Sequence, residues 1–331
     1  MAKNIERLAV IGGGAWGTAL AQVVATGGRD TLLWAREPEV VDAVNARHEN
    51  PVFLPGQPLD PAIRATSDLE ALEDADAWLV VTPAQHMRAV LEATPNCDRP
   101  MILCSKGIDE RSGQLLHHVA RAACPNAEIA VLSGPSFADE VAAGLPTAVT
   151  LAAEDGVLAE TLRMRIALPS FRIYLSDDVI GAEIGGAVKN VLAIACGVVE
   201  GKGLGQNARS ALIARGFAEM TRFGLDCGAQ RETLVGLSGL GDLVLTCSST
   251  SSRNFSLGKG LGEGRSAADL LADRRTVAEG AFTAPVLARL ATERGVDMPI
   301  VVAVDGLLAG RFSVDQLLEQ LLSRPPRAEV A

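Results

Sequence analysis

A glycine-rich run after an apolar segment constrains the fold of this chain more than any other feature. Residues 12–17 read G-G-G-A-W-G, follow the apolar segment 7–11 and open a helix-like segment, 15–26. In a strand–turn–helix unit, Gly12 permits the tight turn, Gly14 lets backbone approach a phosphate, and Gly17 lets the helix lie close on the strand. The helix N-terminus also attracts negative charge. The run predicts a dinucleotide-binding turn; the alternative is a glycine turn that only packs.

The first half of the chain alternates short β-like and helix-like segments. The apolar β-like segments are nearly continuous, as expected for strands that helices cover on both faces. This pattern predicts an α/β fold, with an N-terminal doubly wound Rossmann-type domain of parallel strands over residues 1–177. The predicted strands are 7–11, 31–34, 77–82, 101–105, 129–132, 147–152 and 171–175. The predicted helices are 15–26, 112–123 and a short one that Ser136 and Asp139 would cap, ending at Gly144.

The β pattern disappears near residue 178, and long helix-like stretches follow. They predict a mainly helical C-terminal domain over residues 178–331. Its predicted helices are 180–200, 207–223, 267–271, 283–294, 300–308 and 314–322. The Gly-rich polar stretch 236–265 interrupts this domain and is too long for an idle connector, so it is a candidate for the site.

Composition excludes several classes of partner. The chain has 331 residues, enough for about two domains, with 40 acidic against 30 basic residues and a net charge of −10. This charge repels nucleic acids and anionic membranes. No uncharged apolar stretch approaches the roughly 18 residues of a membrane span, and residues 1–7 lack a signal-peptide core. We expect a soluble cytoplasmic protein with no nucleic-acid partner and no membrane span.

Cysteines and histidines show no metal-binding pattern. The six cysteines are scattered without a C-x-x-C pair and lie mostly among apolar neighbours, which predicts reduced thiols and neither disulfides nor a zinc site. His117 and His118 are adjacent on a predicted helix, where we expect them to face solvent or cap it. No other ligand has matching spacing, so no metal is expected.

The end of the second predicted strand bears on the choice of dinucleotide. An NAD-specific fold usually places Asp or Glu there to bind the ribose 2′-OH, but the strand ends without a carboxylate and Arg36 follows it closely. A guanidinium pairs well with a 2′-phosphate, although Glu37 could still reach the hydroxyls. The prediction is NADP or NAD with NADP favoured; the alternative is that Arg36 is an ordinary surface residue.

Two further segments follow predicted strands at the edge where open α/β sheets bind ligands. Lys106 comes just after the strand 101–105, and Gly107 leaves room beside it. The loop 133–137, S-G-P-S-F, also lies between a strand and a helix, so its backbone N–H groups and hydroxyls could face a polar ligand. Ser136 could instead serve only as the helix cap, and the two roles are compatible.

Lys189 is the most informative single residue, because it interrupts an otherwise apolar, small-residue helix. Burial would lower the pKa of its ammonium and make it a proton donor and acceptor near neutral pH, and Asn190 could orient a substrate oxygen. The alternative is a lysine whose charged end reaches solvent.

The interrupting stretch and the segment after it carry further polar candidates. Asp242 and Thr246 would share one helix face. Ser252-Arg253-Asn254 suits a terminal phosphate, since Arg supplies paired charged donors, although it could be a charged loop facing water. Val277-Ala278-Glu279-Gly280 could place a carboxylate on the cofactor, or be an ordinary helix start.

Taken in order, these segments resemble the bacterial-type NAD(P)-dependent glycerol-3-phosphate dehydrogenase family, over about residues 11–299. The resemblance implies reversible hydride transfer between the nicotinamide and C2 of dihydroxyacetone phosphate, giving sn-glycerol 3-phosphate for phospholipid synthesis, and a homodimer. The motifs that carry it are 12–20, 105–107, 133–138, 186–190, 239–247, 252–254 and 277–280.

The resemblance also implies a role for each matching position. Lys189 matches the proton acceptor in alcohol oxidation. The implied substrate contacts are Lys106, Gly134, Ser136, Lys189, Asp242, Thr246, Ser252, Arg253 and Asn254. The implied cofactor contacts are Gly12, Gly14, Ala15, Trp16, Gly17, Arg36, Lys106, Ala138, Arg253, Val277 and Glu279. Since these residues come from both domains, we expect the site to lie between them.

Two rival functions fit the same two-domain plan. A dehydrogenase of hydroxyacyl thioesters would need a catalytic His–Glu pair, and no histidine lies in the predicted helical domain; a sugar-acid dehydrogenase would need other anchors too. A dinucleotide sensor without activity would have no reason to combine Lys189, Asp242 and Arg253.

Overall fold

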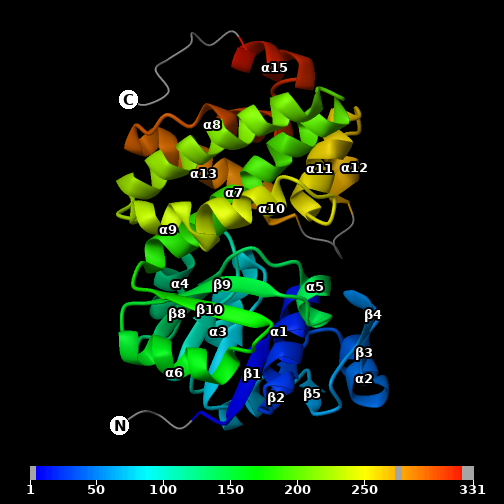
Figure 1. Cartoon of the computed structure of the whole chain (residues 1–331), viewed down its shortest axis with the longest axis vertical. Helices are drawn as coiled ribbons and strands as arrows, with labels where there is room; N and C mark the ends of the chain where they lie inside the picture. Colours follow the sequence, from blue (N-terminus) through cyan, green and yellow to red (C-terminus); the bar gives the residue numbers. More distant parts are fainter. Residues whose placement is uncertain (1–4, 273–277, 323–331) are drawn as a thin grey trace.

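The chain folds into a sheet-containing half and a helical half, stacked one on the other (Figure 1). The computed structural model describes residues 5–272 and 278–322. The α/β fold class with a Rossmann-type first half and a mainly helical second half is confirmed. Domain boundaries at 177 and 178 remain a prediction.

An eight-stranded sheet forms the centre of the first half, in the order β10-β9-β8-β7-β6-β1-β2-β5. The first strand, β1, pairs with β2 on one side and β6 on the other, so the strand order reverses between β1 and β6. Ligands of doubly wound sheets bind at such a reversal. The strands are β1 Arg7–Ile11, β2 Asp30–Trp34, β5 Ile63–Thr66, β6 Ala77–Val80, β7 Met101–Leu103, β8 Ile129–Ser133, β9 Thr147–Ala153 and β10 Phe171–Ser176, with a separate pair, β3 Glu49–Asn50 and β4 Leu54–Pro58.

The expectation of a wholly parallel sheet is wrong at one point. Strand β9 runs antiparallel to β8, and β10 then runs parallel to β9. Parallel neighbours need a long crossover, whereas antiparallel neighbours need only a short connection. Between β8 and β9 the chain has only the five-residue helix α5 (Ala138–Ala142) and its flanking turns, which suits a reversal of direction.

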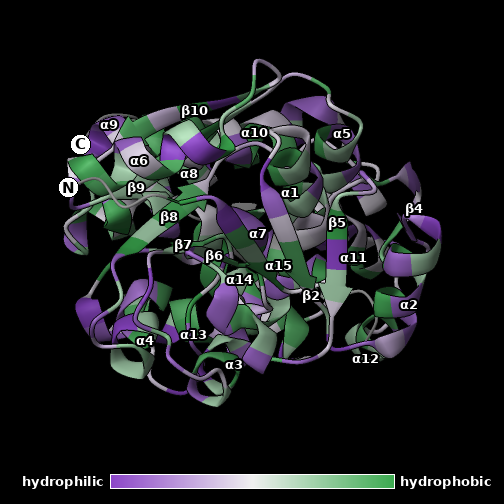
Figure 2. Cartoon of the chain, turned by 90° about the horizontal axis from the view of Figure 1, so that it is seen from below, coloured by the Kyte–Doolittle hydropathy of each residue, from purple (hydrophilic) through white to green (hydrophobic). Residues whose placement is uncertain are grey.

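Helices cover both faces of the sheet. Helices α1, α5 and α6 lie on one face and α3 and α4 on the other (Figure 2). The sequence did not indicate α2, α3 and α6, and helix α4 begins four residues after the predicted start at 112. Besides α5, the helices of this half are α1 Ala15–Thr26, α2 Pro38–Arg47, α3 Met87–Ala93, α4 Leu116–Ala123 and α6 Gly156–Ile166.

Helix α7 (Val179–Gly201) runs through the middle of the second half and is buried over nearly its whole length. It is long and apolar enough to cross a membrane by composition, but 94% of its most apolar window is buried inside the protein. The stretch 236–265, expected as an interruption, contains a π turn at Leu237–Gly241 and two helices. The other helices are α8 Gly205–Asp226, α9 Arg231–Val235, α10 Asp242–Thr246, α11 Arg253–Gly262, α12 Ala267–Leu271, α13 Glu279–Arg294, α14 Pro299–Leu308 and α15 Val314–Leu322.

The predicted cap of α5 is wrong. Ser136 does not cap the helix: its Oγ donates to the carbonyl oxygen of Gly134 (3.0 Å), and α5 begins after Phe137 without a side-chain cap. A capping box of Ser136 and Asp139 would require Ser136 to be the N-cap and the helix to begin at 137. In the structure Phe137 is the N-cap, so α5 begins one residue later, at Ala138.

The expectation that all cysteines are reduced is wrong for one pair. Cys97 and Cys124 form a disulfide, with their Cα atoms 5.6 Å apart. They are 27 residues apart in the chain, and packing of α3 against α4 brings the ends of these helices together. Cys104, Cys196 and Cys247 are free and buried, and Cys227 is free and partly buried.

A buried carboxylate caps one helix of the second half. Glu219 of α8 is 2% exposed and accepts the backbone N–H groups of Ile300 (2.8 Å) and Val301 (3.3 Å) at the start of α14. Burial raises the pKa of Glu219 to about 7, although the two hydrogen bonds oppose this rise.

We expect Glu219→Gln to change how stability depends on pH. Because the folded pKa lies above the reference value of 4.5, the contribution of Glu219 is complete below pH 4.5 and is lost as pH rises through about 7. Gln does not titrate, so the difference in unfolding free energy, wild type minus variant, should fall over this window by up to about 3 kcal/mol. Urea denaturation at several pH values measures it, and a difference independent of pH would contradict the prediction.

Candidate active site

The glycine turn between β1 and α1 has the conformation that its sequence predicts. Gly12 has φ +129°, and a Cβ there would lie 2.8 Å from the carbonyl oxygen of Val81. A Cβ on Gly17 would lie 1.8 Å from the carbonyl oxygen of Gly12, so the helix approaches the turn as closely as only glycine allows. Gly14 is the N-cap of α1, and a Cβ built on it would meet no atom of the described residues within 4 Å. Backbone N–H groups at the start of α1 can therefore receive a pyrophosphate.

Arg36 lies just beyond the end of β2, as predicted. Its side chain is 76% exposed and pairs with Glu37, with 2.8 Å between the guanidinium and Oε1. A guanidinium in this position is free to turn toward a phosphate on the adenosine ribose, while Glu37 is placed to accept from hydroxyls.

Two buried polar atoms fit the predicted dinucleotide. Nε1 of Trp16, in the first turn of α1, and Oε2 of Glu279, at the start of α13, are both buried, and neither has a hydrogen-bond partner among residues 5–272 and 278–322. The other oxygen of Glu279 accepts the backbone N–H of Ala84 (3.3 Å) in the first half. Burial raises the pKa of Glu279 to about 7. An indole N–H and a carboxyl left open in this way are the groups that a ligand would satisfy.

Lys106, Lys189 and Asp242 form the polar centre of the site. Asp242 is 1% exposed and its two oxygens are divided between two ammonium groups: Nζ of Lys189 donates to Oδ1 (2.6 Å) and Nζ of Lys106 donates to Oδ2 (2.7 Å). Lys189 also donates to Oγ1 of Thr246 (2.9 Å), which lies one helical turn from Asp242 on α10. The predicted shared face of Asp242 and Thr246 is confirmed.

The charges in this centre shift one another's pKa values. Burial lowers the pKa of Lys189 to about 8, and the Asp242 charge limits the fall. For Asp242, burial acts to raise the pKa, but the charges of Lys106 and Lys189 outweigh it and hold the pKa below its usual value. Lys189 is therefore a buried amine that can give or take a proton near neutral pH. The alternative in which its charged end reaches solvent is wrong.

The site draws on both halves of the chain, as expected. Lys106 follows β7 in the first half, whereas Lys189 and Asp242 belong to α7 and α10 in the second. Nζ of Lys106 also donates to the carbonyl oxygen of Gly134 (3.2 Å), which places the loop after β8 beside the polar centre. Gly134 has φ +147°, and a Cβ there would lie 2.9 Å from Cα of Val149. Ala138 begins α5 at the end of this loop.

The predicted phosphate-binding group lies at the start of α11. Ser252 caps the helix, its Oγ accepting from the backbone N–H of Phe255 (3.2 Å), and Arg253 follows at the first helical position. Asn254 donates to Oδ1 of Asn190 (3.0 Å) and accepts the backbone N–H of Gly280 (2.9 Å). Asn254 thereby joins α11 to α7 and α13 and fixes the start of α11 relative to these helices.

Val277, a predicted cofactor contact, lies outside the described residues. His117 is not at the surface: it is 3% exposed and its Nδ1 lies 2.5 Å from Oε2 of Glu183 on α7, so the expectation of a solvent-facing or capping histidine is wrong for His117. Its partner is 66 residues away in the chain, and no local pattern signals the pair. Within residues 5–272 and 278–322, no three His, Cys, Asp or Glu side chains form a metal-binding group.

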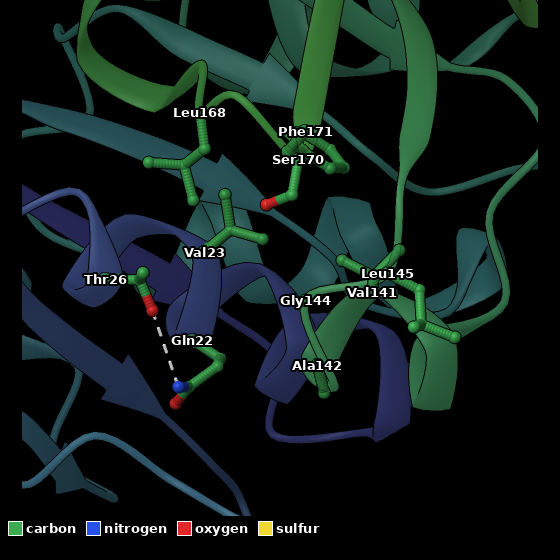
Figure 3. Close-up of a pocket in the computed structure, with 10 residues that line it drawn as sticks. All are labelled: Gln22, Val23, Thr26, Val141, Ala142, Gly144, Leu145, Leu168, Ser170 and Phe171. Atoms are coloured by element: carbon green, nitrogen blue, oxygen red, sulfur yellow. Dashed lines mark hydrogen bonds between the residues drawn. The ribbon is translucent and has the colours of Figure 1, made fainter.

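A hollow away from the polar centre has no charged side chain in its lining. It lies beside α1 and α5 (Figure 3), and Gln22 donates to Thr26 across one edge (3.4 Å). None of the predicted site residues lines it. The lining consists of Gln22, Val23, Thr26, Val141, Ala142, Gly144, Leu145, Leu168, Ser170 and Phe171.

Family models match both halves of the chain. Residues 7–159 match the NAD-dependent glycerol-3-phosphate dehydrogenase N-terminus, and residues 178–319 match the C-terminus of the same family. The chain belongs to this family. It is 66% identical over 322 residues to the glycerol-3-phosphate dehydrogenase [NAD(P)+] of Erythrobacter litoralis, covering 97% of each chain. It is 61% identical over 326 residues to that of Sphingopyxis alaskensis, covering 98% of this chain and 99% of the relative.

A solved member of the family has the same fold over nearly the whole chain. The structure of glycerol-3-phosphate dehydrogenase from Coxiella burnetii superposes with a TM-score of 0.92 at 38% identity, covering 97% of this chain and 99% of that one. The arrangement of the two halves is therefore shared with a family member of known crystal structure.

We expect Asp242→Asn to destabilise the fold near neutral pH. It leaves Lys106 and Lys189 without their counter-charge, and loss of one partner from a buried ion pair costs about 3–5 kcal/mol. The loss should shrink as pH rises through the pKa of Lys189, because a neutral amine needs no counter-charge. Urea denaturation across pH measures the free energy of unfolding, with Thr246→Val as a control that removes only a neutral partner. An Asp242→Asn protein as stable as wild type at pH 7 would refute the pairing.

Proposed function

We propose that this chain is an NAD(P)-dependent sn-glycerol-3-phosphate dehydrogenase that interconverts dihydroxyacetone phosphate and sn-glycerol 3-phosphate. Membership of the family supports the reaction, and its relatives carry that activity in their names. The observation that carries the proposal is the buried centre in which Asp242 pairs with Lys189 of the helical half and with Lys106 of the sheet-containing half. The hydroxyacyl-thioester rival has no support from the buried His117–Glu183 pair, because this histidine belongs to the first half and both groups are occupied with each other.

Lys189 is the proton donor for reduction of the ketone. When bound, the nicotinamide supplies the hydride that adds to C2. Negative charge then develops on the C2 oxygen, and Lys189, with a pKa of about 8, transfers a proton to it. Lys106 adds a second positive charge beside that oxygen and stabilises it. Asp242 holds both ammonium groups in place through its two oxygens.

The substrate phosphate binds at the start of α11. Arg253 offers paired charged donors, and Ser252, Asn254, Gly134 and Ser136 complete the polar surroundings. Binding energy gained at the phosphate fixes the position of C2 relative to Lys189, although the phosphate itself does not react.

The glycine turn would hold the dinucleotide. Gly12, Gly14 and Gly17 allow its pyrophosphate to approach α1, with Ala15 and Trp16 in the first turn. Lys106, Ala138, Arg253, Val277 and Glu279 complete the cofactor contacts. NADP is favoured over NAD because the exposed Arg36 suits the 2′-phosphate.

The cellular setting follows the family resemblance. We propose a cytoplasmic homodimer whose product serves phospholipid synthesis, with residues 1–177 as the dinucleotide domain and 178–331 as the substrate domain. The net charge of −10 supports the absence of a nucleic-acid partner, and burial of α7 supports the absence of a membrane span.

Lys189→Ala should reduce kcat for dihydroxyacetone phosphate by roughly a thousandfold or more, because the alkoxide then lacks its proton donor. NADPH oxidation, followed at the nicotinamide absorbance, measures it. Binding of NADPH by the variant, measured by fluorescence, serves as the control for folding. Full activity of the variant would refute the assigned role, and an inactive but cofactor-binding wild type would favour the sensor.

The same measurement across pH adds a second readout. Reduction needs protonated Lys189, so its kcat should fall as pH rises through about 8; oxidation of glycerol 3-phosphate needs the neutral amine and should fall as pH drops through about 8. Profiles that bend in the same direction for both reactions would contradict proton transfer by Lys189.

Arg36→Ala should weaken NADPH binding selectively. Loss of the guanidinium removes a charged contact to the 2′-phosphate, so KM for NADPH should rise by about tenfold while KM for NADH stays within about twofold. Steady-state kinetics with both cofactors give the ratio. An equal effect on the two cofactors would show that Arg36 does not read the 2′-phosphate.

A further inference from the structure

A buried histidine–glutamate pair joins the two halves of the chain away from the residues assigned to the reaction. His117 lies on α4 and Glu183 on α7, each with 3% of its side chain exposed. Nδ1 of His117 lies 2.5 Å from Oε2 of Glu183, and the backbone N–H of His117 donates to Oε1 (2.9 Å). Both oxygens of a carboxylate from the second half are thus held by one residue of the first.

The start of α4 explains why a carboxylate sits there. The N-cap of this helix is Leu115, which has no side-chain oxygen, and its first turn has no acidic residue. The unpaired backbone N–H groups and the positive end of the helix dipole are therefore open to a carboxylate from elsewhere. Glu183 fills that position from α7, so α4 is capped by the helix that carries Lys189.

Glu183 marks the point where α7 passes from one hydrophobic core to the other. Val179 and Ala182, just before it, pack in the core that the strands share with α3 and α4. Ile184 and Val188, just after it, pack in the core of the helical half. The pair therefore fixes α7 at the residue where the helix crosses from the core of the first half to the core of the second.

We propose that the His117–Glu183 pair is a positioning device that sets α7, and with it Lys189, relative to the dinucleotide-binding half. This inference rests on the proton-transfer role proposed above for Lys189. Glu183 and Lys189 are six residues apart on α7, or about 9 Å along its axis. Misplacement of a reacting group by about 1 Å can cost about a hundredfold in rate. A shift of α7 at Glu183 would move Lys189 as well and would therefore slow the reaction.

Other contacts between the halves are less suited to this task. Lys106 meets Asp242, and the backbone of Ala84 meets Glu279, but substrate and cofactor are expected to engage these groups and so to change the contacts during turnover. Within the described part of the chain the hydrogen bonds of Glu183 go to His117, and neither residue is among the predicted substrate or cofactor contacts. Their tie can persist through the whole cycle.

The test compares Glu183→Ala with Glu183→Gln. Glu183→Ala leaves the N–H of α4 and the ring of His117 without partners, and kcat for dihydroxyacetone phosphate should fall by about tenfold while both KM values stay within about twofold. With NADPH deuterated at the transferred position, the isotope effect on kcat should rise, because the hydride step becomes slower. Gln can accept the N–H and donate to Nδ1, so this variant should keep kcat within about threefold of wild type.

Glu219→Ala is the matched control. Glu219 is also buried and caps the start of α14, but both elements lie within the helical half. Its loss should lower the melting temperature while leaving kcat and the isotope effect unchanged. If Glu183→Ala does not fold, His117→Ala replaces it, since this variant keeps Glu183 on the N–H of α4 and removes only the ring.

The outcomes separate this inference from the proposed function. Unchanged kcat in a destabilised Glu183→Ala or His117→Ala protein would show that the pair only stabilises the fold. An equal loss of kcat in Glu219→Ala would attribute the effect to stability and also overturn the proposal. An active Lys189→Ala enzyme would instead refute the role of Lys189, whatever the Glu183 variants do.

Discussion

The site depends on one buried carboxylate shared by two ammonium groups. Asp242 lies between Lys106 from the sheet half and Lys189 from the helical half, at 2.7 and 2.6 Å. A charged carboxylate that is buried needs a partner of opposite charge. The two ion pairs of Asp242 therefore hold the two halves of the chain against each other and place both lysines beside the same carboxylate. The same contact sets the protonation chemistry, because burial lowers the pKa of Lys189 while Asp242 limits the fall.

Close backbone packing around α7 makes this arrangement possible. A Cβ on Gly197 would lie 2.1 Å from the carbonyl oxygen of Phe255, and one on Gly185 would lie 2.2 Å from that of Ser238. Glycines at these positions let α11 and the π turn before α10 lie directly on the helix. Lys189, one of the few polar residues of α7, is then brought within hydrogen-bond distance of α10. Glycines of α7 thus contribute to the site, as Gly12 and Gly17 contribute to the turn between β1 and α1.

Local signals predicted the parts of the site that depend on neighbouring residues in the chain. The spacing of Gly12, Gly14 and Gly17 after an apolar strand predicts the turn, because Gly12 adopts a positive φ and Gly17 lies against the carbonyl of Gly12, five residues before it. The separation of Asp242 and Thr246 predicts a shared helix face. Lys189 is conspicuous because a charge in an apolar helix needs a partner, but the helix alone does not say which partner.

Contacts between distant segments were beyond such signals. A histidine in a helix such as α4 is usually expected at the surface. His117 is buried because Glu183 of α7 packs against it and pairs with its ring. Cys97 and Cys124 are far apart in the chain and meet because α3 packs on α4. The direction of β9 and the true start of α5 depend on how the chain turns after β8, where hydrophobic pattern is the same for either direction.

Local sequence patterns were enough to predict the type of fold, the glycine turn between β1 and α1, and the side chains proposed for proton transfer and phosphate binding. These follow from periodicity, glycine sterics and side-chain chemistry, which act over a few neighbouring residues. The folded chain was needed to show that Asp242 pairs with both lysines, that Asn254 links three helices and that Glu183 caps α4. Each of these depends on the distance between groups far apart in the chain, and packing of the whole molecule sets that distance.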